Sequence, residues 1–330
     1  MGRLSSPEGG HPLTTASAPG KIILFGEHAV VSGAIALGGA IDLRASVSVQ
    51  DRPGSIVVTS DDLMLRGFSL DLNSGLLSSP DAAYATRYVS AVLQEFDAHD
   101  VEVRIKSSLP ASAGLGSSAA IVVAAVMAIS CHQESSLSLK EIAALSFQLE
   151  KQVQDGLASP TDTALATYGG YLKISSQILP LDLPPLELMV GYTGVPHNTR
   201  SEVEKVQKLK KRYPDLFDHI FQAIGSISLR AAPLIADQNG SELGELMNIN
   251  HGLLEAIGVS SRELCELVYA CRGAGGALGA KITGAGGGGC MIAIPGPAGK
   301  ETLMTAIRQA GGWPFAAKMG QEGVRLEREE

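Results

Sequence analysis

The chain has 330 residues, of which 45% are hydrophobic, so it can bury a sizeable core, and its length favours two domains. Its formal net charge of −8 argues against a nucleic acid or an anionic membrane surface as the main partner. An anionic ligand would have to be held by a local site rather than by the overall field.

The cysteines and the apolar runs indicate a cytoplasmic protein. Cys131, Cys265, Cys271 and Cys290 form no CxxC pair, and none stands near a histidine at the spacing of a zinc motif. We therefore expect reduced thiols. The longest apolar run, residues 119–129, is too short to cross a bilayer. The N-terminal MGRLSS fits a short myristoylation pattern, but the Pro-, Gly- and Ser-rich residues favour a flexible tail over residues 1–14.

Short β-rich runs alternate with helical patterns in the first part of the chain. Strands are predicted at residues 21–25, 44–49, 55–60 and 101–106, and helices at 81–96 and 139–153. After Pro184 and Pro185 come a strand at 186–192 and a nearly continuous helical stretch, 201–272. This change predicts two domains, residues 15–184 and 185–330. The chain is expected to close with a strand at 290–294, a helix at 300–309 and a last strand.

The segment PASAGLGSSAA, residues 110–120, lies between a predicted strand and an apolar helix. Gly114 and Gly116 permit a tight turn, and Ser117 and Ser118 stand where a helix N-cap is expected. The free N–H groups and positive dipole end of a helix N-terminus attract phosphate. A plain strand–turn–helix with a capping serine explains the segment equally well, and no Walker A motif occurs.

The segment KITGAGGGGC, residues 281–290, contains five glycines between Thr283 and Cys290. It could connect two strands of a hairpin, but a hairpin needs one or two glycines rather than four in a row. The excess predicts close backbone approach to a ligand or to the first glycine-rich segment.

The segment APGKIILFGEHAVV, residues 18–31, places Lys21 at the start of a strand and Glu27 and His28 in the turn after it. Residues at strand ends commonly supply binding groups. A metal pair of Glu27 and His28 is disfavoured because no third ligand stands at a suitable spacing.

These three motifs, in this order and over nearly the full length, resemble the GHMP kinase superfamily. Within it, GEHAVV, ASPTDTALATYGG (residues 158–170) and VPHNTRSEVEKV (195–206) are most similar to mevalonate kinases, since a galactokinase would carry a GEHTDY-like sequence. The resemblance implies an α+β two-domain GHMP kinase fold. Its N-terminal domain would be like domain 2 of ribosomal protein S5 and its C-terminal domain ferredoxin-like, with the site in the cleft. It also implies transfer of the ATP γ-phosphoryl group to the mevalonate 5-hydroxyl, with Mg²⁺, in isoprenoid biosynthesis.

The resemblance further implies roles for particular residues. Asp162 would accept or orient the hydroxyl proton, and Lys21 would contact Asp162 and the transferring phosphate. Ser118 and Glu150 would hold Mg²⁺. The ATP-binding residues would be Pro110, Ala111, Ser112, Ala113, Gly114, Leu115, Gly116, Ser117, Ser118 and Ala119. The substrate-binding residues would be Glu27, His28, Thr199 and Ala285, with His197 and Arg200 as candidates for the carboxylate.

Several alternatives stay open. The segment between Glu150 and Asp162 is one residue longer than the family pattern near 154–156, which makes Asp155 a competitor. Glu150 also fits a solvated helix residue paired with a lysine. Read without the family, Ser159 would cap the helix that carries Asp162, with Pro160 at its first position. Other functions are a phosphomevalonate kinase, a mevalonate 3-kinase or a non-catalytic metabolite-binding homologue. Dimers occur in the family, so a homodimer is a further expectation.

Overall fold

The computed structural model describes residues 12–60, 68–71, 76–77, 83–110, 113–156, 158–196, 198–274 and 276–328. Of the predicted features, residues 1–11 of the N-terminal tail, and Ala111, Ser112 and His197, lie outside the described residues.

A single sheet runs through the molecule, and its main path has the strand order β10-β11-β9-β12-β2-β6-β3-β4-β5. Strand β1 pairs with β2 and β13, and the hairpin β7–β8 pairs with β2. The bounds of the strands are β1 Thr14–Phe25, β2 Ala36–Asp51, β3 Val57–Ser60, β4 Phe68–Asp71, β5 Leu76–Leu77, β6 Val101–Ser107, β7 Tyr171–Ile174, β8 Ile178–Leu181, β9 Leu186–Tyr192, β10 Ala277–Ile282, β11 Cys290–Pro295, β12 Trp313–Met319 and β13 Arg325–Leu326.

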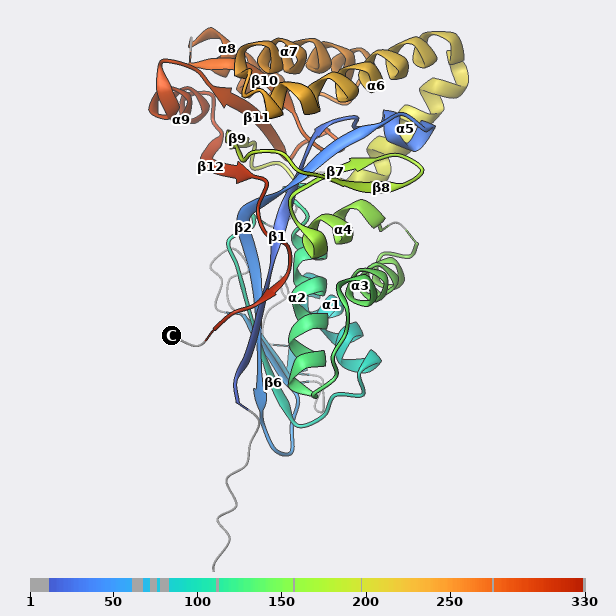
Figure 1. The fold of residues 1–330 in the computed structure, drawn as a ribbon, viewed down its shortest axis with the longest axis vertical. Helices are drawn as coiled ribbons and strands as arrows, with labels where there is room; N and C mark the ends of the chain where they lie inside the picture. The colour runs from blue at the N-terminus through green and yellow to red at the C-terminus, as the bar shows by residue number, and fades with distance from the viewer. Residues whose placement is uncertain are drawn as a thin grey trace, which may run out of the picture.

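The antiparallel strands β1 and β2 are much longer than the sequence predicts, and they extend from the lower half of Figure 1 into the upper half. The glycines within these strands have a low strand propensity, so the sequence patterns predicted shorter strands. A Cβ at Gly39 would lie 2.6 Å from Met319 Cε, and one at Gly38 would lie 3.0 Å from Leu165 Cδ1, so other side chains pack closely over both positions. The two strands therefore continue through glycines over which other elements pack.

The helices gather in two groups. Their bounds are η1 Ala29–Ser32 (a 3₁₀ turn), α1 Ala83–Glu95, α2 Ser117–His132, α3 Leu139–Val153, α4 Pro160–Tyr168, α5 Thr199–Arg212, α6 Pro214–Ala236, α7 Gly240–Ala256, α8 Arg262–Gly273 and α9 Gly299–Gln309. The stretch predicted as nearly continuous helix is therefore four helices. Pro214 begins α6, and the side chains of Asn239 and Ser261 cap α7 and α8.

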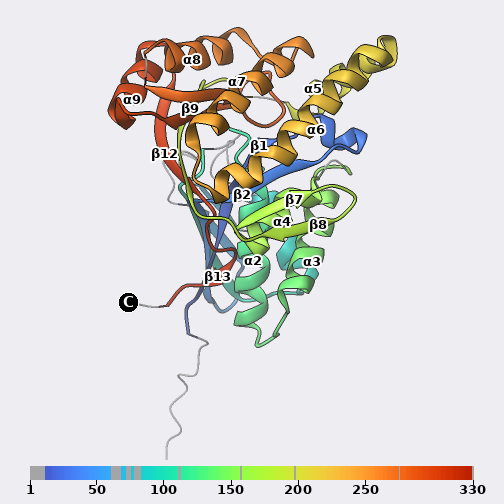
Figure 2. The same ribbon diagram turned by 45° about the horizontal axis from the view of Figure 1, so that its top comes forward.

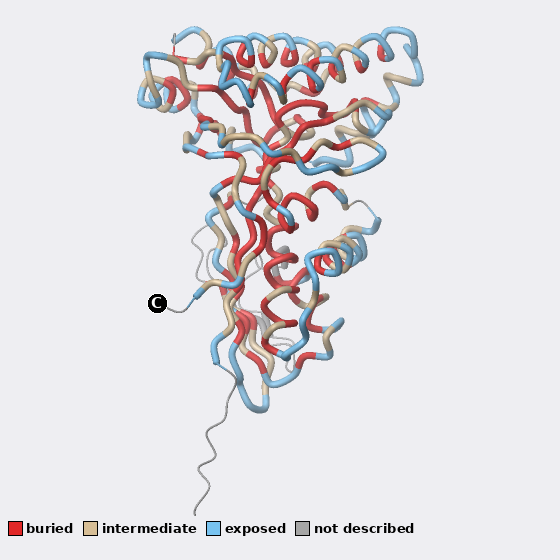
Figure 3. Tube along the Cα trace, viewed as in Figure 1, coloured by how far each residue is buried: buried red, intermediate tan, exposed pale blue. Residues whose placement is uncertain are grey.

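Helix α2 forms the centre of the lower half of the molecule. It packs on β1 and β2 with one side and on α1, α3 and α4 with the others (Figure 1). Its residues from Ala119 to Val126 are all buried, which Figure 3 shows as a continuous red core. Its many alanines allow the neighbouring elements to approach closely.

The upper half is an antiparallel arrangement of β10, β11, β9 and β12 with α7, α8 and α9 packed on it. Helix α6 packs against η1, β1 and β2 (Figure 2). The predicted division at 184/185 falls between β8, which belongs to the β2 side, and β9, which pairs with β11 and β12. The last segment returns to the lower half, where Leu326 of β13 pairs with Ala16 of β1. Among the described residues, no helix has both the length and the apolar character needed to cross a bilayer.

Candidate active site

Lys21 and the first loop, defined as residues 110–116, are in direct contact. The Lys21 amide donates a 2.8 Å hydrogen bond to the Leu115 carbonyl. Gly116 has a φ of 75°, and a Cβ there would lie 2.8 Å from Lys21 Cγ. The glycine therefore both permits the left-handed turn and leaves room for the stem of Lys21.

Gly116 also caps helix α2. The expectation that Ser117 or Ser118 is the N-cap is wrong, because both lie inside the first turn and no side chain caps this end. Because a glycine in the left-handed conformation can end the loop abruptly, the helix begins directly after Gly116. Ser117 and Ser118 are therefore its first two residues. The orphan amides and the positive dipole end of α2 consequently face the space beside Lys21, which suits a phosphate.

Ser118 and Glu150 meet beside this helix end. Ser118 Oγ donates a 2.6 Å hydrogen bond to Glu150 Oε1, and Gln154 Nε2 donates another of 3.0 Å to the same oxygen. Glu150 is only 2% exposed, so it is not the solvated helix residue that the sequence also allowed. Its Oε2 atom is buried and has no hydrogen-bond partner among the described residues.

Burial, and then the negative charge of Asp162, raise the pKa of Glu150 to about 7. A buried carboxylate with one unsatisfied oxygen beside a serine hydroxyl fits a divalent cation that takes oxygen ligands. Asp155, the predicted competitor, lies in the exposed turn after α3 with a φ of 50°. Among these acidic groups Glu150, rather than Asp155, is therefore the one beside Ser118.

Asp162 stands in the first turn of α4, and its Oδ2 lies 3.3 Å from Lys21 Nζ. Pro160 begins the helix as predicted. Ser159 occupies the N-cap position, but its side chain makes no capping hydrogen bond, so that part of the expectation is wrong. The Asp162 carboxyl therefore lies between the positive end of α4 and the Lys21 side chain.

Glu27 is bound to a residue to which the sequence assigned no role. Its Oε1 accepts a hydrogen bond from the ammonium of Lys281 in β10, and Lys281 is fully buried. Burial raises the pKa of Glu27 and lowers that of Lys281, while their mutual attraction opposes both shifts. The only sequence signal for Lys281 is a charged residue within an otherwise apolar strand next to the glycine motif.

Two further hydrogen bonds join the glycine loop, residues 283–289, to β1 and to the turn after it. Thr283 Oγ1 donates a 2.8 Å hydrogen bond to the Ile23 carbonyl. His28, which has a φ of 60°, donates through Nε2 to the Ala285 carbonyl at 2.9 Å. His28 and Ala285, both predicted to bind substrate, are thus bonded to each other.

Helix α5 contributes the outer side of this region. The carboxylate of Glu202 acts on His28 electrostatically and also lies against Gly287. Thr199 stands at the exposed first position of α5, one turn before Glu202. Arg200 pairs with Glu204 of its own helix at 2.9 Å.

The glycines of the glycine loop serve different neighbours. A Cβ on Gly284 would lie 3.9 Å from the Gly114 carbonyl, so this glycine faces the first loop as expected. A Cβ on Gly286, Gly287 or Gly288 would instead lie within 2.7 Å of Val259, Glu202 or Val195, respectively. Most of the glycine run therefore packs on parts of the protein other than the first loop, which the sequence did not predict.

A separate hollow of about 590 Å³ lies between η1 and α6, lined by residues such as Gly33, Lys210, Phe221 and Leu229. Its lining includes residues 32–35, directly after the first motif segment, but none of the residues to which the motifs assign a role. The residues predicted to be catalytic and to bind Mg²⁺ lie elsewhere, at Lys21 and beside the start of α2, so we do not assign the reaction to this hollow.

Comparison with known proteins agrees with this arrangement. The family model for the GHMP kinases N terminal domain matches residues 83–170, and that for the GHMP kinases C terminal matches residues 231–312. A mevalonate kinase of Pyrococcus abyssi is 40% identical over 331 residues, which cover 96% of this chain and 98% of that protein. The chain belongs to the GHMP kinases. Among the GHMP kinases, the mevalonate kinase of Saccharolobus solfataricus is 38% identical over 86% of this chain and 90% of its own.

Solved structures of GHMP kinases have the same fold. The mevalonate kinase of Methanococcus jannaschii matches with a TM-score of 0.80 at 29% identity, over 96% of this chain and all of that one. The L. major mevalonate kinase in complex with R-mevalonate matches with a TM-score of 0.80 at 26% identity, over 97% and 100%. The predicted superfamily, the α+β fold class and an ATP-dependent phosphotransferase that acts on a hydroxyl group are therefore confirmed.

Proposed function

We propose that this GHMP kinase transfers the γ-phosphoryl group of ATP to the 5-hydroxyl of mevalonate, which yields 5-phosphomevalonate and ADP. The observation that carries the proposal is the Lys21–Asp162 ion pair of 3.3 Å near the N-terminus of α2, where no side chain makes a capping hydrogen bond. The choice of mevalonate is supported by the relatives named mevalonate kinase and by the L. major structure with R-mevalonate.

Asp162 is the acceptor-side group. As a carboxylate held by Lys21, it would accept the proton of the substrate hydroxyl, or orient that hydroxyl, as it attacks the γ-phosphorus. The Lys21 ammonium would offset the negative charge that develops on the transferring group. The Lys21 stem lies against Gly116, which favours a preorganised position of its ammonium for the reaction.

The phosphates would lie at the first loop, with residues 110–119 as the binding segment and the amides at the start of α2 as donors. Ser118 Oγ and the Glu150 carboxylate would hold Mg²⁺, and the fit is supported by the unsatisfied, buried Oε2 of Glu150. When bound, Mg²⁺ supplies neutralisation of the phosphate charge.

Glu27, His28, Thr199 and Ala285 remain the proposed substrate wall. In this proposal Glu27 acts mainly by holding the turn, because its carboxylate is occupied by Lys281. His28 and Ala285 present the surface where the glycine loop meets α5. A homodimer and a cytoplasmic location stay predictions.

The closest alternative keeps the fold and changes the acceptor. A phosphomevalonate kinase of Streptococcus pneumoniae matches with a TM-score of 0.71 at 17% identity, which is a likeness of fold alone. The identity to mevalonate kinases is much higher, and it favours mevalonate over its phosphate.

The test is ADP release from Mg-ATP with mevalonate, 5-phosphomevalonate, homoserine or galactose, with identification of the phosphorylated hydroxyl by ³¹P NMR. We expect turnover with mevalonate at its 5-hydroxyl, a loss of about 10²–10⁴-fold in Asp162→Asn, and parental activity in the exposed control Asp182→Asn. Turnover with another alcohol would reject mevalonate and keep the kinase. No turnover with ATP still bound would favour a non-catalytic homologue.

A further inference from the structure

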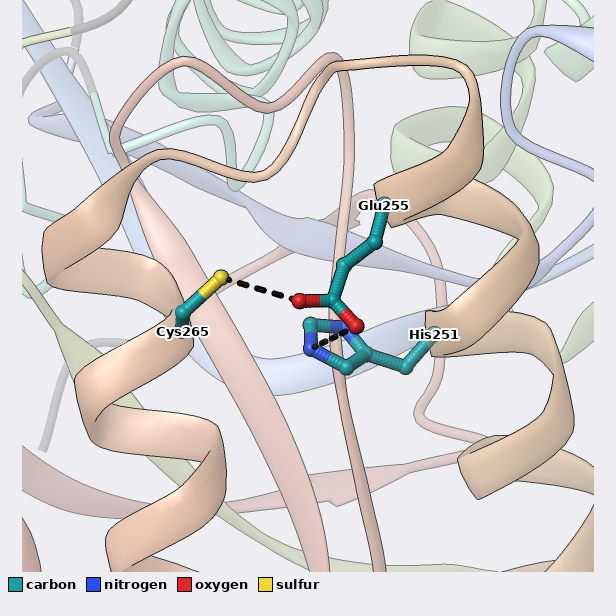
Figure 4. A group of neighbouring side chains, drawn as sticks. All are labelled: His251, Glu255 and Cys265. Atoms are coloured by element: carbon teal, nitrogen blue, oxygen red, sulfur yellow. Dashed lines mark hydrogen bonds and ion pairs between the residues drawn. The ribbon is translucent and has the colours of Figure 1, made fainter.

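Three metal-ligating side chains meet on helices α7 and α8, outside the proposed kinase site (Figure 4). His251 and Glu255 are four positions apart and share one face of α7, and Cys265 points at them from the first turns of α8. His251 Nε2 lies 3.8 Å from Glu255 Oε2, and Cys265 Sγ lies 3.2 Å from Glu255 Oε1. The nitrogen, sulfur and oxygen atoms all lie within 4.8 Å of one another.

The histidine has polar atoms that the protein leaves unsatisfied. His251 is fully buried, and neither ring nitrogen has a hydrogen-bond partner among the described residues. An unsatisfied buried nitrogen costs free energy that a ligand could recover. The ring is aimed at the carboxylate, too far for a hydrogen bond but at a spacing that an ion between them would use.

We propose that His251, Glu255 and Cys265 bind one zinc ion. Imidazole, carboxylate and thiolate are the ligands that Zn²⁺ takes in proteins, at about 2.0–2.3 Å, which separates the ligand atoms of a tetrahedral centre by roughly 3.3–3.8 Å. The separations between these side chains need only small side-chain movements to reach that geometry. On binding, the Cys265 thiol releases its proton to solvent, and a water completes the coordination.

Neighbouring groups support the ligands. Tyr269 OH donates a 3.3 Å hydrogen bond to Glu255 Oε2, and Ser260 Oγ lies 3.1 Å from Cys265 Sγ. Such contacts orient metal ligands and tune their affinity. Glu255 and Cys265 are partly exposed, so the ion has a path from solvent.

Two positively charged side chains lie near the proposed zinc site, so its ligands need to supply negative charge. Arg272 and Lys281 both act on the His251 ring electrostatically, which disfavours a cation held by neutral groups. The carboxylate and the thiolate supply two negative charges that offset the ion. This balance favours a thiophilic metal such as Zn²⁺ over Mg²⁺, which prefers oxygen ligands and binds thiolate poorly.

The site would fasten the turn between α7 and α8. Val259 in that turn accepts a 2.8 Å hydrogen bond from the Gly287 amide, and so supports the glycine loop. A metal ion that joins α7 and α8 would fix the turn between them, and with it the position of Val259 under the glycine loop. We therefore expect it to stabilise the fold rather than to take part in phosphoryl transfer.

The test uses the full chain without a histidine tag, treated with EDTA and desalted, and titrated with Co²⁺ as a spectroscopic probe and then with Zn²⁺. We expect one Co²⁺ per chain with a thiolate-to-cobalt charge-transfer band, displacement by Zn²⁺, and a higher thermal midpoint with Zn²⁺. Cys265→Ser should lose the charge-transfer band. Both Cys265→Ser and Glu255→Gln should bind Co²⁺ at least about 10-fold more weakly than the unaltered chain.

Two controls separate this site from others. Cys131→Ser removes a partly exposed cysteine outside the cluster and should keep the band, and Glu150→Gln alters the proposed magnesium site and should also keep it. In the unaltered chain, Zn²⁺ should slow alkylation of Cys265 measured by mass spectrometry, which avoids any folding defect of a variant. Absence of a charge-transfer band, or an alkylation rate that Zn²⁺ does not change, would overturn the proposal.

Discussion

The Lys281 ammonium of β10 binds the Glu27 carboxylate, although the two residues stand 254 positions apart and both are almost completely buried. Each charge depends on the other, because neither side chain has access to water. Together with the Thr283–Ile23 and His28–Ala285 hydrogen bonds, this pair fastens the third sequence motif to the first.

Removal of Lys281 should destabilise the protein strongly. Lys281→Met leaves the Glu27 carboxylate buried without its cation, and we expect a loss of about 3–5 kcal/mol in the free energy of unfolding, measured with urea. The double variant Glu27→Leu/Lys281→Met removes both charges and should be more stable than Lys281→Met alone. If the effects of the two single substitutions simply add, the pair is not coupled and this account fails.

Loss of the Lys21 ammonium should lower catalysis more than binding. In Lys21→Met we expect kcat to fall by about 10²–10³-fold, because the charge of Asp162 and that of the transferring phosphate are no longer offset. Steady-state kinetics with Mg-ATP measure this. Lys151→Met, which removes an exposed lysine next to Glu150, is the matched control and should behave as the parent. Equal losses in both variants would point to net charge rather than to the ion pair.

Affinity for Mg²⁺ should depend on pH through Glu150. Because the pKa of this carboxyl is about 7, it holds a proton below that pH, and the proton competes with the metal. We expect the apparent KM for Mg²⁺ to rise as the pH falls from about 8 to about 6. Glu150→Gln should lack this dependence, and a flat profile in the parent would contradict the assignment.

In the metal-free protein, a rise in pH that improves Mg²⁺ binding at Glu150 should instead lower the free energy of unfolding. Between pH 4.5, the ordinary pKa of a glutamate, and pH about 7, its pKa in the folded chain, the folded chain holds a proton that the unfolded chain has released. The contribution of Glu150 to the free energy of unfolding therefore falls as the pH rises through this window. Urea unfolding in EDTA at both ends of the window, compared with Glu150→Gln, measures it, and Mg²⁺ should reverse the trend.

Gly116 and Gly156 form a natural pair of test positions. Both have positive φ values, 75° and 92°, so an alanine costs each about 1–2 kcal/mol of backbone strain. Only at Gly116 would the new Cβ also meet Lys21, whereas at Gly156 it meets nothing within 4 Å. We expect Gly116→Ala to lose at least as much stability in urea as Gly156→Ala, and only Gly116→Ala to lose kcat by about 10-fold or more. Unchanged turnover in Gly116→Ala would remove the positional role of this contact.

Most of the secondary structure and the superfamily followed from local patterns. Pro160 begins α4, and the apolar run after Ser118 is the buried core helix. The errors lie where packing outweighs local propensity. Strand β2 continues through Gly38 and Gly39, over which Leu165 and Met319 pack. Gly116, in a left-handed conformation beside Lys21, occupies the N-cap position of α2 in place of a serine.

The order of the motifs, their residue types and their spacing determined that this chain is a GHMP kinase, and they predict which side chains carry its chemistry. Only the tertiary structure decided which side chains meet: Ser118 with Glu150, Glu27 with Lys281, and His251 with Glu255 and Cys265, and the sequence had assigned no role to Lys281 or to the last three. It also decided that most of the glycine run packs on the protein itself. The reason is physical, since propensity and periodicity are properties of neighbouring residues. Burial, ion pairing and close backbone approach depend instead on how the sheet brings distant segments together.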